Sequence, residues 1–177
     1  MTKNWSFEGI VIKRISLGEA DRLLTVFTKE SGKIVLMAKS VRKIASRRGG
    51  NIELFNLIRG QAHGGTLGEV GLIQSFPSWR RYLGRVTLAY QLCEVVDKLT
   101  GDDQAHPRVF AILKMALTHL GSLGDNWKEQ MDSWLLEILV DLGFWSDGKK
   151  LEQDVFEYVE TVVSRRMYSR DFLLKLH

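Results

Sequence analysis

The segment that decides the fold of the first half is residues 22–40, RLLTVFTKESGKIVLMAKS. Residues 22–29 are rich in apolar and β-branched side chains and residues 33–40 alternate in polarity, so both are predicted to be strands. Residues 30–33 contain Gly32, which tolerates the positive φ of a tight turn. One face of the second strand would carry Ile34, Leu36 and Ala38, and the other Val35, Met37 and Lys39. The stretch predicts a β-hairpin.

Three other segments on either side of the hairpin share this strand character. They are residues 8–16, residues 52–62 and residues 66–76, and Pro77 ends the last of them. Five short strands joined by glycine-containing turns are typical of a small closed barrel. The strand count fits both an oligonucleotide-binding barrel and an SH3-like barrel, so both remain open on this evidence.

The apolar period changes from 2 to 3.6 after Pro77-Ser78. A first helix, buried on most sides, is predicted from Trp79 onward. Pro107 suits the first turn of a second helix. The period change divides the chain into two predicted domains, residues 1–77 and residues 78–177, and gives an α+β fold with the strands first.

A third helix is predicted to open at Asn126, which has capping-box spacing to Glu129, and to end before Gly143. Residues 151–176 predict further helix, with a break near Ser164 or Ser169. The second domain is therefore expected to be all-helical.

A basic loop joins the third and fourth predicted strands. Its sequence, residues 39–50, is KSVRKIASRRGG and contains no acid. Its basic residues are Lys39, Arg42, Lys43, Arg47 and Arg48. Cations beside two closing glycines can approach a phosphate backbone closely. The loop is either a contact site for nucleic-acid phosphates or a solvated loop that favours solubility.

Further residues of the same half extend this candidate nucleic-acid site. The basic candidates are Arg14, Arg22 and Lys33, with Lys13 nearby in sequence. Candidates for stacking on unpaired bases are Trp5, Phe7, Phe27 and Phe55. Phe27 and Phe55 lie in apolar segments, however, which is more typical of core residues.

Formal charge is divided unevenly between the two halves. Residues 1–80 carry a net charge of +7 and residues 81–177 a net charge of −3, consistent with +4 for the whole chain. Near the end of the acidic half, Arg165, Arg166, Arg170 and Lys175 form a second basic cluster. This cluster is either favourable charge at a helix C-terminus or a site for an acidic partner segment.

Several kinds of chemistry find no support in the sequence. The Gly-Lys pair at Gly32 lacks the glycine and hydroxyl residue of a phosphate-binding loop. The four histidines are scattered, and Cys93, the single cysteine, suits a helix core. We expect neither catalysis, metal nor cofactor. No segment is apolar enough to span a membrane and no signal sequence is visible, so a cytoplasmic location is expected.

A set of motifs connects the chain to a known family. In the first half they are GIVIK at 9–13, GEADRLLTVFT at 18–28, Gly32-Lys33, Ala38-Lys39, Glu53-Leu54-Phe55 and QSFP at 74–77. In the second half they are LVDLGF at 139–144 and SRRMYSRDFL at 164–173. Taken together, these blocks resemble the bacterial recombination mediator family RecO.

The resemblance implies an oligonucleotide-binding (OB) barrel over residues 1–77 and a helical, partner-binding domain over residues 78–177. It implies a DNA-repair protein of homologous recombination that binds single- and double-stranded DNA, anneals complementary strands and helps a recombinase load onto DNA coated by single-strand-binding protein. The implied partners are RecR and the acidic C-terminal tail of single-strand-binding protein, and the implied location is the cytoplasm, in association with the nucleoid. Lys39 matches a basic position of the family, and residues 42–48 match its basic extension less closely.

The chain departs from the family pattern at one place. Many relatives insert a four-cysteine zinc module after a Leu-Gly-Tyr element, whereas residues 144–148 continue here without cysteine. No zinc module is therefore expected. Two other functions remain open from the residues alone. One is an interaction adaptor that recruits single-strand-binding protein through the helical domain, and the other is an RNA-binding barrel protein.

Overall fold

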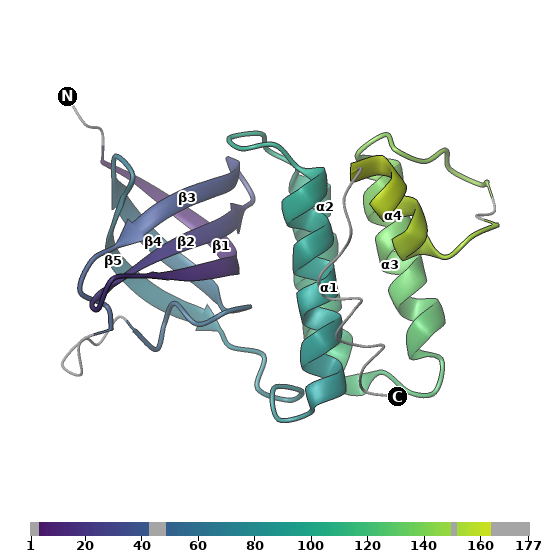
Figure 1. Ribbon diagram of the computed structural model, residues 1–177, viewed down its shortest axis with the longest axis horizontal. Coiled ribbons are helices and arrows are strands. Elements are labelled where there is room, and N and C mark those ends of the chain that lie inside the picture. The colour runs from purple at the N-terminus through teal and green to yellow at the C-terminus, as the bar shows by residue number, and fades with distance from the viewer. Residues whose placement is uncertain (1–3, 43–48, 150–151, 164–177) are drawn as a thin grey trace. The chain divides into compact units, whose positions relative to one another are not determined.

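The computed structural model describes residues 4–42, 49–149 and 152–163. The chain divides into two compact units. The first comprises Met1–Phe76 with Gly101–Phe110, and the second comprises Pro77–Thr100 with Ala111–His177. Strands come first along the chain and helices follow, as the colour gradient of Figure 1 shows, which confirms the α+β class.

Five strands are found among the described residues, as predicted. They are β1 (Asn4–Leu17), β2 (Asp21–Thr28), β3 (Gly32–Ala38), β4 (Leu57–His63) and β5 (Thr66–Gln74). The strands form a closed barrel in the order β1-β2-β3-β5-β4, with β1 also paired to β4. The β3–β5 pairing is parallel and the other four pairings are antiparallel.

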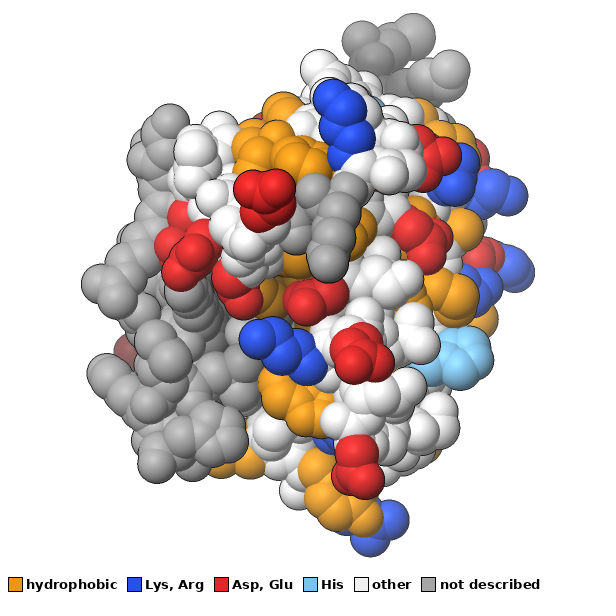
Figure 2. Space-filling view, turned by 90° about the vertical axis from the view of Figure 1, so that its right-hand side faces the viewer, with side chains coloured by type: hydrophobic (Ala, Val, Ile, Leu, Met, Phe, Trp, Pro, Cys, Tyr) orange, Lys and Arg blue, Asp and Glu red, His pale blue; other side chains and the backbone are white. Residues whose placement is uncertain are grey.

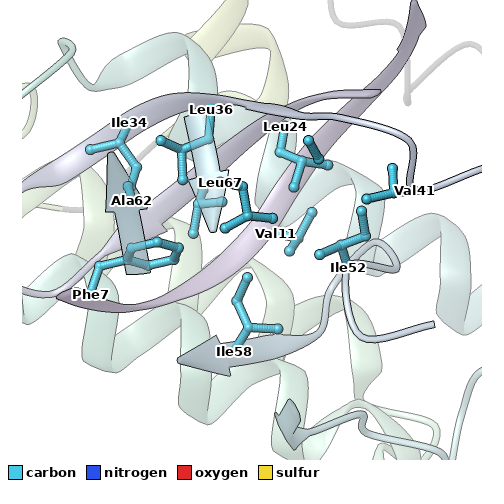
Figure 3. Close-up of a cluster of buried hydrophobic side chains, with 12 residues drawn as sticks. Phe7, Val11, Leu24, Ile34, Leu36, Val41, Ile52, Ile58, Ala62 and Leu67 are labelled. Atoms are coloured by element: carbon cyan, nitrogen blue, oxygen red, sulfur yellow. The ribbon is translucent and has the colours of Figure 1, made fainter. Parts of the chain in front are cut away.

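The barrel core follows from the alternation of the strand residues. Ile34, Leu36 and Ala38 of β3 are at most 5% exposed, whereas Val35 between them is 45% exposed, so the predicted faces are confirmed. Figure 3 shows the core cluster to which these residues belong. Val41 and Ile52, which lie outside the strands, also belong to it and sit together at one end.

The prediction that residues 52–56 begin the fourth strand was wrong, because β4 starts at Leu57. Phe55 has a φ of 70°, which no strand residue adopts. Its N–H donates to the Val11 carbonyl at 2.8 Å, and the Val11 N–H donates to the Asn56 carbonyl at 3.0 Å. Ile52 and Phe55 are apolar because both side chains are buried, at 0% and 3% exposed, although neither residue lies in a strand.

A segment distant in sequence completes the first unit. In Gly101–Phe110, the Asp103 N–H donates to the Lys33 carbonyl at 2.9 Å. The ring centroids of Phe110 and Phe27 are 6.4 Å apart. This segment therefore covers part of the outer surface of β2 and β3, an arrangement that local sequence patterns do not predict.

Four α-helices and one 3₁₀ turn are found among the described residues. They are α1 (Leu83–Leu99), α2 (Pro107–His119), η1 (Leu120–Ser122), α3 (Trp127–Asp141) and α4 (Val155–Val163). Pro107 opens α2 as predicted, but the first helix begins at Leu83 and not at Trp79. Trp79 is fully buried for a different reason, since its indole Nε1 donates to the Leu117 carbonyl at 2.7 Å.

The ends of α3 agree in part with the prediction. Asn126 is the N-cap residue, but its side chain makes no capping hydrogen bond, so the predicted capping box is not formed. Gly143 has a φ of 78°. Its N–H donates to the Val140 carbonyl, and the N–H of Phe144 donates to the Leu139 carbonyl. This pair of bonds is a Schellman motif, which ends the helix as predicted. The predicted break near Ser164 or Ser169 lies outside the described residues.

The β2–β3 turn generates a stability prediction. Gly32 has a φ of 69°, and a Cβ built there would lie 1.7 Å from the backbone oxygen of Gln104. Gly32→Ala is therefore expected to lower the free energy of unfolding by about 2–5 kcal/mol, because backbone strain and overpacking add. Urea denaturation of the purified chain measures this loss.

Gly18→Ala is the matched control for this substitution. Gly18 also has a positive φ, 55°, but a Cβ there would meet nothing within 4 Å. Gly18→Ala should therefore lower the free energy of unfolding by only about 1 kcal/mol, the cost of placing alanine in the left-handed region. Equal losses for the two variants would contradict the close packing of Gly101–Phe110 on the turn.

Candidate nucleic-acid interface

The β1–β2 turn holds the start of the basic loop. The Ser40 N–H donates to Asp21 Oδ1 at 2.7 Å. The Arg42 N–H donates to the Ala20 carbonyl at 3.0 Å, and Arg42 Nη1 donates to the Gly18 carbonyl at 2.6 Å. Three hydrogen bonds from Ser40 and Arg42 therefore join the start of the basic loop to residues 18–21.

The Asp21 contact has a clear conformational role. Ser40 has a φ of 57°, in the left-handed region that costs a non-glycine residue roughly 1–2 kcal/mol. A charge-assisted hydrogen bond from its N–H to a part-buried carboxylate offsets this cost. The contact fixes the direction in which the chain leaves β3 after Lys39.

The other end of the basic loop is held by two asparagines. The buried Asn56 side chain donates from Nδ2 to the carbonyls of Gly50, at 3.2 Å, and Asn51, at 2.9 Å. Asn51 Nδ2 in turn donates to the Val70 carbonyl of β5 at 3.1 Å. These bonds satisfy polar groups next to Ile52, which is fully buried in the barrel core.

The basic loop is thus fixed to the barrel at both ends. Val41 on one side and Ile52 on the other are buried in one core cluster. Lys39 and Arg42 are exposed between the β3 end and the rest of the loop. Lys43, Arg47 and Arg48 lie outside the described residues.

Two of the predicted basic residues, Arg14 and Arg22, converge on one carboxylate. Arg14 Nη1 lies 2.5 Å from Glu53 Oε2, and Arg22 Nη1 lies 3.4 Å from Glu53 Oε1. The two arginine side chains are 23% and 18% exposed, whereas the Glu53 side chain is 45% exposed. We call these three residues the arginine–glutamate cluster. It joins β1 and β2 to the end of the connection that contains the basic loop.

Lys33 is placed apart from the other candidates. It lies at the start of β3, whereas Lys39 follows the end of the same strand. Its Nζ is 3.5 Å from Asp102 Oδ1, and its side chain is only 13% exposed. The structure therefore does not bring Lys33 together with the basic loop.

The outward surface of β1, β2 and β3 carries two cross-strand rows, which we call the outer rows. One row is Ile15, Leu23 and Met37, and the other is Lys13, Thr25 and Val35. Ile15 and Val35 are each 45% exposed, and Lys13 is exposed. Lys39 continues the outward face of β3, so the exposed apolar side chains of the outer rows, such as Val35, lie beside basic residues.

The aromatic candidates are mostly buried. Phe7, Phe27 and Phe55 are at most 5% exposed, which confirms the interpretation of Phe27 and Phe55 as core residues. Trp5 is partly buried, and its ring centroid is 5.6 Å from that of Phe7. Aromatic stacking on bases is therefore limited to Trp5 within this set.

The helical unit offers a different surface. Figure 2 shows acidic and basic side chains interspersed with apolar and uncharged ones on the face that carries α3 and α4. Arg165, Arg166, Arg170 and Lys175 lie outside the described residues. Burial, with a smaller contribution from Asp97, raises the pKa of the Cys93 thiol, so this cysteine remains a protonated core residue.

Two features are absent from the described residues. They contain no group of three or more His, Cys, Asp or Glu side chains placed to hold a metal ion. Within the same part of the chain, no helix has the length and apolar character needed to cross a membrane.

Sequence patterns missed the residues that build this site. Asp21, Asn51 and Asn56 contribute side-chain hydrogen bonds that fix the loop, and Glu53 pairs with two arginines. The only available signal was that Asp21 and Glu53 fall within motifs recognised for other reasons. These features define a two-unit protein in which a β-barrel presents an anchored basic loop and a helical unit follows.

Comparison with known proteins agrees with this description. The family model for the N-terminal part of recombination protein O matches residues 1–76, and that for its C-terminal part matches residues 80–148. The DNA repair protein RecO of Dehalococcoides mccartyi (strain 195) is 35% identical over 127 residues, 68% of this chain and 50% of the relative. That of Syntrophotalea carbinolica is 33% identical over 142 residues, 77% of this chain and 54% of the relative.

A third relative, the DNA repair protein RecO of Halalkalibacterium halodurans, is 34% identical over 117 residues, 64% of this chain and 46% of the relative. The chain belongs to the recombination protein O (RecO) family. It spans about half the length of the curated relatives that it matches.

Asp21→Ala tests the anchoring of the basic loop. It removes the acceptor of the Ser40 N–H and leaves a residue with positive φ unsupported, so we expect a loss of about 1–3 kcal/mol in unfolding free energy. Asp21→Asn retains an oxygen acceptor and should lose less. Urea denaturation of both variants measures the difference, and an Asp21→Ala variant as stable as the unmodified chain would contradict the anchoring role.

Proposed function

We propose that this chain is a non-enzymatic DNA-repair protein that binds DNA through its barrel unit. The observation that carries the proposal is the basic loop, fixed at both ends to the barrel by Val41, Ile52 and the Asp21–Ser40 contact. A cationic loop whose two ends are fixed in this way can bind an anion at a reduced entropic cost. Membership of the RecO family and the name of its relatives, DNA repair protein, support the same assignment.

We infer that residues 1–77 form a domain of the OB type. The closed order β1-β2-β3-β5-β4 is compatible with a five-stranded Greek-key barrel of that type. OB barrels bind oligonucleotides on the face of strands 2 and 3 and with the loops after strands 1 and 4. In this chain the corresponding surfaces are the outer rows and the β1–β2 turn, which contacts the basic loop.

Each part of this surface has a proposed role. Phosphates are bound by the basic loop, through Lys39, Arg42, Lys43, Arg47 and Arg48. Exposed aliphatic side chains of the outer rows, such as Ile15 and Val35, contact the faces of unpaired bases. Neutralising phosphates on two strands lowers their repulsion, so the same surface supports binding of single and double strands and annealing of complements.

The remaining steps are assigned to the second domain, residues 78–177. We propose that it contacts RecR and the acidic tail of single-strand-binding protein, and so helps a recombinase to load onto coated DNA. Arg165, Arg166, Arg170 and Lys175 are the proposed contacts for the acidic tail. These assignments rest on the family resemblance and on the charge of that segment.

Charge reversal tests the DNA-binding role. Lys39→Glu, Arg47→Glu and Arg48→Glu are combined in one variant, and binding to a fluorescent oligothymidylate is measured by anisotropy over a range of salt concentrations. If each residue meets one phosphate, the slope of log K against log salt should fall in magnitude by about 2. Affinity at low salt should fall at least about tenfold.

In the control variant three exposed lysines outside the basic loop are replaced by glutamate, namely Lys29, Lys128 and Lys149. It has the same change in net charge and should retain most of the salt slope. Unchanged binding by the loop variant, with an intact melting transition, would contradict the proposal. Tighter binding to an RNA of equal length would favour the RNA-binding alternative.

A further inference from the structure

The arginine–glutamate cluster is not balanced in charge. Arg14 and Arg22 are both permanently positive, and Glu53 is the only carboxylate paired with them in the described contacts. Arg14 and Arg22 share the face of Leu24 in the β1–β2 ladder, and Leu24 is a fully buried core residue. The cluster therefore holds about one excess positive charge where β1 and β2 meet the barrel interior.

The cluster also has spare hydrogen-bond donors. Arg14 Nη1 and Arg22 Nε are buried, and neither has a hydrogen-bond partner with good geometry among the described residues. Arg14 Nη1 is close to Glu53 Oε2, so the contact satisfies the distance but not the direction of a hydrogen bond. A single carboxylate leaves donors of both guanidinium groups unused, whereas a phosphate group presents more acceptor oxygens.

The exposures of the three side chains indicate how an anion would approach. Glu53 is 45% exposed, about twice as much as either arginine. Solvent, and any incoming anion, therefore reaches the carboxylate more readily than the guanidinium groups beneath it. Glu53 also lies in the connection between β3 and β4, three residues after Gly50 of the basic loop.

We propose that Arg14 and Arg22 form a binding site for one phosphate of the DNA backbone, which Glu53 occupies when DNA is absent. Glu53 thereby competes with the phosphate, weakens binding and favours release of the strand. This inference rests on the proposed function and adds to it a residue that limits affinity. No covalent step is involved, because one anion replaces another on the same two guanidinium groups.

Glu53→Gln is the direct test. Removing the competing charge is expected to tighten oligothymidylate binding about fivefold, the value of one part-exposed ion pair. The magnitude of the salt slope is expected to rise by about 0.7, the contribution of one additional phosphate of a single strand. Combining Glu53→Gln with Arg14→Gln should remove both gains, because the site then lacks one of its two cations.

Glu8→Gln is the matched control. Glu8 lies on β1 and pairs with Arg59 at 3.4 Å, so the substitution also removes one acid from one ion pair of the same barrel. Arg59 is 73% exposed and stands alone in that pair, so no additional phosphate is expected to bind there. An equal effect of Glu8→Gln would attribute the gain to net charge and would overturn the proposal, as would an unchanged salt slope for Glu53→Gln.

Two further measurements keep the test decisive. If Glu53→Gln does not fold, Arg14→Gln alone should lower the affinity for oligothymidylate at low salt, because the site loses one of its two cations, and an unchanged affinity would overturn the site. If the unmodified chain does not bind DNA at low salt, the proposed function fails. The site is then judged with inorganic phosphate, which should raise the melting temperature of Glu53→Gln above its value in chloride of equal ionic strength. Absence of that rise would overturn the phosphate site.

Discussion

The insertion of Val41 and Ile52 into the barrel core is the constraint on which the rest of the first unit depends. The two residues flank the middle of the basic loop, and burial of both side chains in one cluster fixes the loop ends. Asp21, Asn51 and Asn56 then satisfy the polar backbone groups that this closure brings near the core. Buried apolar side chains and hydrogen-bonded backbone groups thus act together at both ends of the loop.

The same constraint explains the uneven roles of the basic residues. Arg14 and Arg22 are partly buried and are paired with Glu53, whereas the side chains of Lys39 and Arg42 are exposed to solvent. Lys33 lies at the other end of β3 and pairs with Asp102. Positive charge in the first half of the chain is therefore partly used to join segments.

Local patterns predicted the parts of the fold that are determined by local periodicity. The alternation around Ile34, Leu36 and Ala38 and the turn at Gly32 correctly gave the β2–β3 hairpin. The failures concern apolar residues with non-local partners. Ile52 and Phe55 were predicted to be strand residues because buried loop residues and buried strand residues have similar sequences. Trp79 was assigned to a helix, whereas it lies before α1, where its side chain is buried and donates a hydrogen bond to the Leu117 carbonyl.

The candidate site was predictable to a smaller extent. The charge of the basic loop is visible in the sequence, and so is its position after a strand. The pairing of Glu53 with arginines some thirty to forty residues earlier is not visible, because it depends on how β1, β2 and the loop end meet in space. The packing of Gly101–Phe110 on β2 and β3 was hidden for the same reason.

Hydrogen exchange, measured by mass spectrometry with and without a saturating oligothymidylate, tests the central claim most directly. If the anchored basic loop on the barrel is the DNA-binding surface, bound oligothymidylate should slow amide exchange in residues 39–56 and in the β1–β2 turn that contacts them. Exchange in α3 and α4 should be unchanged in the absence of protein partners. Protection confined to the helices, with none in residues 39–56, would contradict the account.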